Sequence, residues 1–335
     1  MISISGFSIS LDRREKFADI DFVSHAHSDH IGAAKSSKRV MASTETVQLL
    51  KANSGIDVKR MEGNNTLETE MLPAGHILGS RQLYAYDSET GTTFLYSGDF
   101  QMQRSSVAEP IATKHADILI IDSTYPNPDI CFGPRDDTIG ALQDWVARSL
   151  RKSSIIFSAY ATGKAQELIA ILNEIGIKPV VTSKISRISK VYKENGYDLE
   201  YASAYDGSEY EELLSGDFVG ITERRDVDML GAVLERVHKH SFSTAVVTGF
   251  ARIFKFYTDA QFSLSDHADF AQSLDYINEV GPKVIYTYGG NADIFAVNLR
   301  KFGLKAMPYQ AAMPNQMVAV SRNQITPESS ENKEI

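Results

Sequence analysis

The sequence predicts an α/β protein in which a unit of alternating strands and helices interrupts a region built mainly of short strands. Residues 3–125 contain short apolar runs separated by turn residues, and residues 138–250 alternate between helical and strand-like patterns. Residues 284–303 then return to one strand and one helix. A chain of 335 residues is long enough for two such units, or for one domain with a large insertion.

The first region is predicted to contain strands and one helix. The strands are expected within residues 3–12, 19–24, 91–99 and 117–125. The helix is expected over residues 43–55, because this stretch opens with a Ser/Thr cap and closes on Gly55. Three prolines and a glycine in "PNPDICFGPRDD", residues 126–137, then predict a boundary.

The middle region is predicted to form a separate sheet. Helices are expected over residues 138–152, 163–176 and 184–196, and strands over residues 154–160, 178–183 and 243–250. Because strands and helices alternate, we expect a small, parallel, doubly wound sheet. A last helix is expected over residues 291–303, and the polar tail, residues 322–335, is expected to be disordered.

Composition narrows the class of protein. Hydrophobic residues make up 43% and charged residues 23% of the chain, as in ordinary globular proteins, and no apolar run approaches the roughly 20 residues that span a membrane. The first residues lack the pattern of a secretory signal, so we expect a cytoplasmic protein with no membrane partner. The single cysteine, Cys131, excludes an internal disulfide and a cysteine-based zinc site. A net charge of −9 requires that any nucleic-acid partner be met by a local basic patch or by metal.

Three of the eight histidines lie in "SHAHSDH", residues 24–30. His25 and His27 alternate just beyond a predicted strand, so their side chains can converge past the sheet edge, and Asp29 and His30 follow in a loop. Neutral imidazoles and carboxylates bind divalent cations such as zinc at about 2.0–2.2 Å. The spacing therefore predicts a metal site rather than a surface loop of hydrogen-bonded histidines.

Two isolated residues are candidates for the remaining ligands. His76 in "PAGHILGS" and Asp99 in "YSGDF" each sit in a glycine-flanked turn after an apolar run, where a side chain is held at the edge of a sheet. Each residue alone would more often be an ordinary loop residue. Their order after the histidine motif is what makes them informative.

That order resembles the metallo-β-lactamase superfamily, and Asp12 in "SISLDRRE" matches the acidic residue that precedes the family's histidine motif. Asp122 in "IIDSTYPNP" and His267 in "FSLSDHADF" look like motifs of the nucleic-acid-processing branch called β-CASP, and "FSAYATGKAQELIAIL" is also similar to that branch. Within the branch, "SDHADF" and "TGFARIF" look most like ligase-associated DNA exonucleases and archaeal exonucleases related to mRNA 3′-end processing factors.

The resemblance implies a fold and its boundaries. The fold would be a metallo-β-lactamase αββα sandwich with an inserted Rossmann-like β-CASP domain. The two parts of the sandwich would span residues 1–125 and 253–321, the β-CASP cassette would span residues 126–252, and the tail would span residues 322–335.

The resemblance also implies a site. One zinc ion would be held by His25, His27 and His76, a second ion by Asp29 and His30, and Asp99 would bridge them, with Mn²⁺ as a possible substitute. Asp12 would lie beside the ligands as a structural residue. Asp29, Asp122 and His267 would be the catalytic residues, with His267 giving a proton to the leaving oxygen and Asp122 holding its ring.

The sequence departs from this pattern at Tyr288 in "TYGGNAD", where relatives that process RNA carry a histidine for the second metal. A neutral phenol is a poorer ligand for a divalent ion than imidazole. We therefore expect one tightly held metal ion and a second, weaker one.

The function that the resemblance implies is a metal-dependent nuclease that trims DNA ends, acting on single-stranded or duplex-end DNA or RNA. The alternatives are an RNA-processing β-CASP ribonuclease, a small-molecule metallo-hydrolase and a weakened binding subunit. A stripe of basic residues at near-helical spacing is equally well interpreted as a solvated helix face or as a nucleic-acid contact; it comprises Lys184, Arg187, Lys190 and Lys193.

Overall fold

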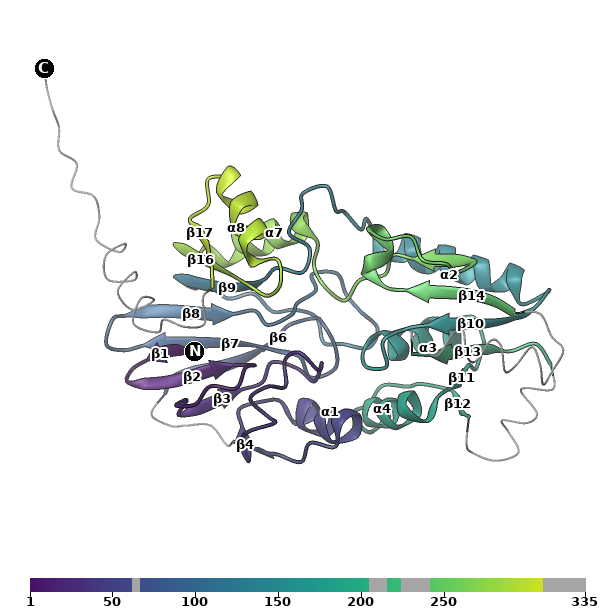
Figure 1. Ribbon diagram of the computed structural model, residues 1–335, viewed down its shortest axis with the longest axis horizontal. Helices are drawn as coiled ribbons and strands as arrows, with labels where there is room; N and C mark the ends of the chain where they lie inside the picture. The colour runs from purple at the N-terminus through teal and green to yellow at the C-terminus, as the bar shows by residue number, and fades with distance from the viewer. Residues whose placement is uncertain (62–66, 205–215, 224–241, 310–335) are drawn as a thin grey trace, which may run out of the picture.

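The computed structural model shows two units that lie end to end (Figure 1). The structure describes residues 1–61, 67–204, 216–223 and 242–309. The tail expected to be disordered, residues 322–335, lies outside the described residues. No helix among the described residues is long and apolar enough to cross a membrane.

The first unit contains two stacked sheets. The small sheet has the order β1 (Ile2–Ile4), β2 (Phe7–Leu11), β3 (Ile20–Phe22). The large sheet has the order β17 (Ala306–Pro308), β16 (Val284–Tyr288), β9 (Ile118–Asp122), β8 (Thr92–Tyr96), β7 (Arg81–Asp87), β6 (Thr69–Pro73). A short parallel pair, β4 (Arg39–Val40) and β5 (Lys59–Arg60), lies beside them.

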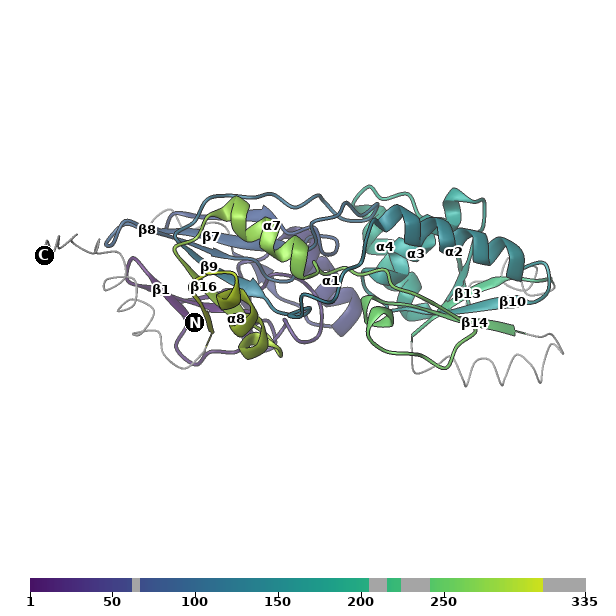
Figure 2. The ribbon, with the colours of Figure 1, turned by 90° about the horizontal axis from the view of Figure 1, so that it is seen from above.

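Alternation of apolar residues explains why the sheets stack. Ile9 and Phe22 of the small sheet share one buried cluster with Leu83, Tyr96 and Ile120 of the large sheet. The other face of the large sheet is covered by helices α7 (Phe270–Val280) and α8 (Ala292–Lys301), as Figure 2 shows. The unit is thus layered as helices, large sheet and small sheet.

The second unit is built on six parallel strands, as the alternation of strands and helices predicts. Their order is β12 (Ala202–Ser203), β11 (Val180–Val181), β13 (Val219–Thr222), β10 (Ser154–Ser158), β14 (Phe242–Val247), β15 (Ala260–Phe262). Helices α2 (Arg135–Ser149), α3 (Lys164–Glu174) and α4 (Ser183–Glu194) pack on it.

This sheet runs past residue 252, where we expected the second unit to end. Strand β15 pairs with β14 in parallel, with Ala245 opposite Ala260 and Val247 opposite Phe262. The sequence gives little sign of it, because a strand of three residues is too short to establish an alternating pattern.

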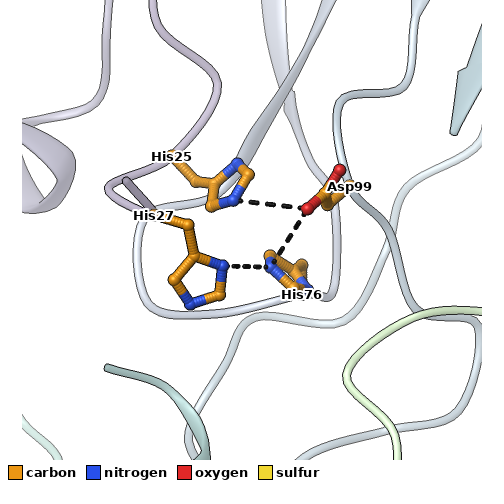
Figure 3. A group of neighbouring side chains, drawn as sticks. All are labelled: His25, His27, His76 and Asp99. Carbon is orange, nitrogen blue, oxygen red and sulfur yellow. Dashed lines mark hydrogen bonds and ion pairs between the residues drawn. The ribbon is translucent and has the colours of Figure 1, made fainter. Parts of the chain in front are cut away.

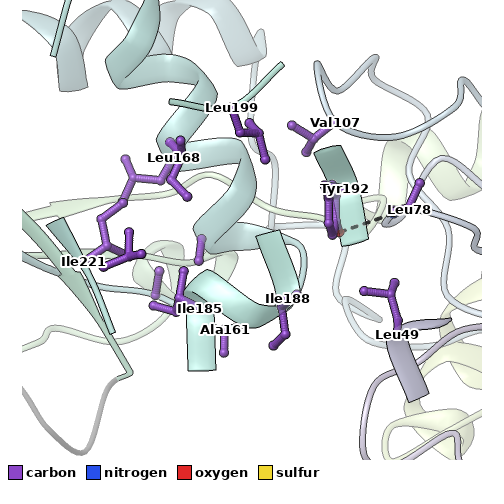
Figure 4. Close-up of a cluster of buried hydrophobic side chains, with 14 of the residues drawn as sticks. Leu49, Leu78, Val107, Ala161, Leu168, Ile185, Ile188, Tyr192, Leu199 and Ile221 are labelled. Atoms are coloured by element: carbon purple, nitrogen blue, oxygen red, sulfur yellow. Dashed lines mark hydrogen bonds between the residues drawn. The ribbon is translucent and has the colours of Figure 1, made fainter. Parts of the chain in front are cut away.

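A buried apolar cluster joins the two units (Figure 4). Helix α1 (Thr44–Ser54), capped by Ser43 and closed by Gly55 as predicted, contributes Leu49, and α4 contributes Ile188 and Tyr192. The backbone N–H of Leu78 in the first unit donates to the hydroxyl of Tyr192 at 3.4 Å. Because these side chains leave water only when the units meet, the hydrophobic effect holds the units together.

The site lies at one edge of the large sheet. Strands β8, β9 and β16 are parallel, and β6 has the same direction because two antiparallel pairings separate it from β8. Their carboxyl ends therefore meet at a single edge, beside the second unit (Figure 1). The predicted residues His76, Asp99, Asp122 and Tyr288 end these strands or follow them in the next turn.

Candidate metal centre and active site

Four of the predicted ligands meet in one cluster (Figure 3). The ligand atoms of His25, His27, His76 and Asp99 all lie within 4.8 Å of one another. Nε2 of His25 and Nε2 of His76 are 3.4 and 3.7 Å from Oδ2 of Asp99, and Nδ1 of His27 is 3.0 Å from Nε2 of His76. The turn that carries Asp99 requires glycine at the preceding position. Gly98 has φ +54°, and an added Cβ there would lie 2.8 Å from the Cβ of Ser24.

The outer nitrogens of two of these rings are bound to carbonyl oxygens. Nε2 of His27 donates to the carbonyl of Thr162 at 3.1 Å, and Nδ1 of His76 donates to the carbonyl of Asp266 at 2.8 Å. A carbonyl only accepts, so it fixes the hydrogen on that nitrogen. The inner nitrogens, Nδ1 of His27 and Nε2 of His76, are then free of hydrogen in the neutral rings and can bind a cation.

The charge state of the cluster suits a cation. Burial, together with the neighbouring imidazoles, holds the pKa values of His25 and His76 well below the usual range, and burial also lowers the pKa of His27. Nε2 of His25 is buried and has no hydrogen-bond partner among the described residues. A buried nitrogen without a partner, facing other lone pairs, is costly unless a positive ion satisfies it. The residues of the cluster therefore fit a metal ion.

Asp99 connects this cluster to His30. One carboxylate oxygen of Asp99 faces the cluster, and the other, Oδ1, lies 3.3 Å from Nε2 of His30. Asp29, whose side chain is 76% exposed, places Oδ2 3.6 Å from the same nitrogen. Burial raises the pKa of Asp99 to about 6. Asp99 thus lies between the cluster and His30, and Asp29 lies on the exposed side of the same His30 nitrogen.

Asp12 holds His30 in place from behind. Its carboxylate accepts hydrogen bonds from Nδ1 of His30 and the hydroxyl of Tyr96, both at 2.7 Å, and from the backbone and hydroxyl of Ser24 at 2.6 and 2.7 Å. Asp12 has φ +62°, a conformation that is unfavourable for any residue with a Cβ. The four hydrogen bonds stabilise this strained position, which turns Nε2 of His30 towards Asp99.

Tyr288 lies where the departure from the family pattern was expected. It ends β16, lines the same cavity as the metal cluster, and its ring centroid is 6.5 Å from that of His30. Its hydroxyl accepts from Nε of Arg13 at 3.1 Å, and burial raises its pKa to about 12. A protonated phenol already bound to a guanidinium is a poor metal ligand.

His267 and Asp122 form a pair beside the cluster. Nδ1 of His267 is 2.9 Å from Oδ2 of Asp122, and Nε2 of His267 is 3.9 Å from Oδ2 of Asp99. Burial by itself would lower the pKa of His267, but the carboxylates of Asp99 and Asp122 raise it to about 9. The other oxygen of Asp122 accepts from the backbone and hydroxyl of Thr124 at 2.9 and 2.7 Å. The ring is therefore fixed and holds a proton at neutral pH.

A buried ion cluster that the sequence analysis did not identify supports the turn that carries His267. Nζ of Lys164 lies 2.6 Å from Asp266 and 2.7 Å from Glu167, and Glu167 also pairs with Arg135. Arg135 donates in addition to the carbonyl of Ser265. The spacing of Lys164 and Glu167, one helical turn apart in a buried helix, is the only sequence signal for this cluster.

A cavity of about 550 Å³ lies over the histidine–aspartate cluster and is lined by both units. Of the basic stripe on α4, Lys184 lines this cavity, with Nζ 2.8 Å from Oε1 of Glu223. Arg187 donates to the carbonyl of Ala52 at 2.7 Å, Lys190 is exposed, and Lys193 lies 5.7 Å from the ring of Tyr201. The structure thus brings one member of the stripe to the site, and the others lie farther along the helix.

Stacked sheets with a histidine–aspartate cluster at one edge are consistent with the superfamily that the sequence resembles. No family model matches the chain. The chain is 31% identical over 300 residues to a probable DNA ligase of Opitutus terrae, in an alignment covering 85% of this chain and 28% of the ligase.

Two further relatives match shorter stretches. The DNA cross-link repair protein pso2/snm1 of Schizosaccharomyces pombe is 28% identical over 198 residues, which cover 53% of this chain and 35% of that protein. An RNase J-like protein of Methanocaldococcus jannaschii is 28% identical over 188 residues, which cover 48% of this chain and 44% of that protein. The chain spans less than half the length of each of these three relatives. These relatives support the resemblance of the chain to the β-CASP branch of the metallo-β-lactamase superfamily.

The buried ion cluster predicts a large loss of stability on removal of its lysine. Lys164→Met leaves the buried carboxylate of Glu167 and the partly buried one of Asp266 with one cation, and breaking a buried pair typically costs about 3–5 kcal/mol. We expect a decrease of that size in the free energy of unfolding, measured by urea titration. Lys190→Met, at an exposed position of α4, is the control and should change it by less than about 0.5 kcal/mol. Equal stabilities of the two variants would contradict the structural role of Lys164.

The position of Tyr288 predicts the metal content. After dialysis we expect about one tightly held ion per chain in the unmutated protein, rising towards about two in Tyr288→His, because an imidazole is added beside His30. The content is measured by atomic absorption, and Tyr288→Phe, which removes the hydroxyl without adding a ligand, should stay at about one. Two tightly held ions in the unmutated protein would show that Tyr288 does not limit the second site.

Proposed function

We propose that the protein is a metal-dependent nuclease that hydrolyses phosphodiester bonds of nucleic acid and trims DNA ends exonucleolytically. The observation that carries this proposal is the His267–Asp122 pair, which faces the candidate metal ligands across Asp99. A phosphodiester bound at those ligands has its leaving oxygen within reach of a protonated imidazole. Metal ions and a proton donor arranged in this way can together catalyse the cleavage of a phosphodiester.

Each residue of the site has a defined task in this proposal. His25, His27, His76 and Asp99 would hold one zinc ion, and Asp29, His30 and Asp99 a weaker second one, with Mn²⁺ as a substitute. Such ions, when bound, activate a water molecule and neutralise charge on the phosphoryl oxygens.

The chain's own groups then complete the reaction. His267 gives the proton on Nε2 to the departing oxygen, and Asp122 keeps the ring oriented and stabilises its charged form. Thr162 and Asp266 orient the ligand rings through their carbonyls. Lys184 offers a cation to a neighbouring phosphate in the cavity.

Several observations support nucleic acid as the substrate class. Relatives are named for DNA ligation, DNA cross-link repair and RNase J. We propose that the second unit is the β-CASP cassette and that it covers a strand lying across the metal cluster. Lys190 and Lys193 would contact its backbone beyond the cavity. The DNA preference rests on the likeness of "SDHADF" and "TGFARIF" to ligase-associated exonucleases.

The proposal predicts shortening of end-labelled DNA. With Mn²⁺ or Zn²⁺ we expect labelled single-stranded and duplex DNA to be shortened from an end, and a chelator to abolish the reaction. His30→Ala should be inactive while its circular dichroism spectrum stays unchanged, because it removes a ligand and little apolar packing. Degradation of RNA but not DNA would support the RNA-processing alternative. Hydrolysis of small esters but of no polynucleotide would overturn the proposal.

The role of His267 predicts a dependence on the leaving group. His267→Ala should lower the rate on an ordinary phosphodiester by about 10²–10⁴-fold, with metal content unchanged. A substrate with a sulfur leaving atom needs no proton, so the variant should recover most of the lost rate on it. The control is the unmutated protein on both substrates. If the rate of the variant fell by the same factor on both substrates, His267 would not be the proton donor.

A further inference from the structure

The surface beside the catalytic cavity carries an unusual group of exposed apolar side chains. Nine large hydrophobic residues are exposed among the described residues, and three of them, Ile253, Phe254 and Tyr257, fall within five consecutive positions. Phe254 is 57% exposed and Tyr257 is fully exposed, and Tyr160, at 55%, lies on the wall of the catalytic cavity. Exposed apolar groups that gather in this way mark a binding surface.

A row of rings connects this surface to the catalytic histidine. The ring of His267 lies 6.2 Å from that of Tyr125, Tyr125 lies 5.7 Å from Phe250, and Phe250 lies 6.2 Å from Phe254. Phe250 and Tyr160 line both the catalytic cavity and a neighbouring cavity of about 490 Å³. The row therefore starts at the reacting centre and ends in solvent.

The segment that presents these rings is held in place by hydrogen bonds. The amide nitrogen of Gln261, on edge strand β15, donates to the carbonyls of Ala251 and Phe254 at 2.8 and 3.2 Å, and its oxygen accepts from the backbone N–H of Phe256 at 3.0 Å. At Gly249 an added Cβ would lie 2.2 Å from the hydroxyl of Tyr125, so only glycine permits this close approach. The rings are thus positioned before any ligand binds.

Basic residues alternate with the rings. Arg252 and Lys255 in "FARIFKFY" are exposed and form no ion pair with any described residue. The nearby carboxylate of Asp259 is bound to the backbone and hydroxyl of Thr244 at 2.7 and 3.1 Å. Lysine is depleted from the centres of protein–protein interfaces, whereas rings interleaved with cations are typical of surfaces that bind single-stranded nucleic acid.

We propose that residues 249–257, with Tyr160, form a stacking platform for unpaired bases of the strand whose phosphodiester is cleaved at the metal cluster. This inference rests on the proposed nuclease function and narrows its substrate class to single-stranded segments or overhangs. The bases of a duplex are stacked on each other and paired, so they cannot lie on these rings. The rings bind the bases, and Arg252 and Lys255 meet the phosphates between them.

The test compares substitutions that keep or remove a ring. Phe254→Ala/Tyr257→Ala should raise KM for a single-stranded oligonucleotide by about tenfold or more, because stacking on each ring contributes to affinity. The slope of affinity against salt should stay unchanged, because no phosphate contact is lost. Phe254→Leu/Tyr257→Leu should lose as much affinity for the oligonucleotide as the alanine variant does. Phe254→Trp/Tyr257→Trp should retain the affinity of the unmutated protein. Phe17→Ala, which removes an exposed ring from another surface, is the matched control.

A small phosphodiester, bis(p-nitrophenyl) phosphate, separates this inference from the proposed function. Its hydrolysis should be unchanged in the alanine and leucine variants, because it does not reach the platform. Unchanged KM for the oligonucleotide in those variants would overturn the platform while leaving the nuclease intact. Full affinity in the leucine variant would indicate an apolar docking surface for a protein and overturn it as well. Hydrolysis of the small diester without any polynucleotide cleavage by the unmutated protein would overturn the proposed function itself.

Discussion

The buried charge of Lys164 ties the two units to each other and to the site. A lysine that is only 2% exposed is strongly unfavourable unless carboxylates surround it, and one of its two carboxylates, Asp266, comes from a turn about a hundred residues later in the chain. The ion cluster is complete only when α3 and this turn are together. The same turn supplies the carbonyl that orients His76 and the side chain of His267. The contacts that pack the units together therefore also position these residues of the site.

The second unit and the turn that follows β15 also fix the tautomers of two candidate metal ligands, His27 and His76. The hydrogen on the outer nitrogen of His27 is fixed by the carbonyl of Thr162, which precedes α3 in that unit. Burial of the three rings beside one another lowers the pKa values further, so that lone pairs face the centre of the cluster. Asp12 performs the corresponding task for His30 from within the first unit. Orientation by groups behind the ligands is a general requirement of metal sites.

The proposed function requires a protein with a net charge of −9 to bind a negatively charged polymer without attraction from its overall charge. The positive charge would be supplied locally by metal ions at the histidine–aspartate cluster, by Lys184 in the cavity and by Arg252 and Lys255 on the rim of the cavity. Stacking on Phe254 and Tyr257 would add affinity that does not depend on charge. In the same proposal, the strand would follow the row of rings from His267 outward.

The sequence alone predicted many of the elements and indicated the candidate residues of the site. The alternation of strands and helices predicted the parallel sheet, and the motif around His25, His27 and His30 indicated the metal cluster, because these patterns are local and repeat at fixed spacings. Only the tertiary structure decided which groups support them. Thr162 acts through a backbone carbonyl, which has no signature in sequence. The pairing of His267 with Asp122, 145 positions apart, was implied by the family resemblance, and no local pattern predicts it. The attachment of Tyr288 to Arg13, across 275 positions, likewise depends on how the two stacked sheets bring distant strand ends together.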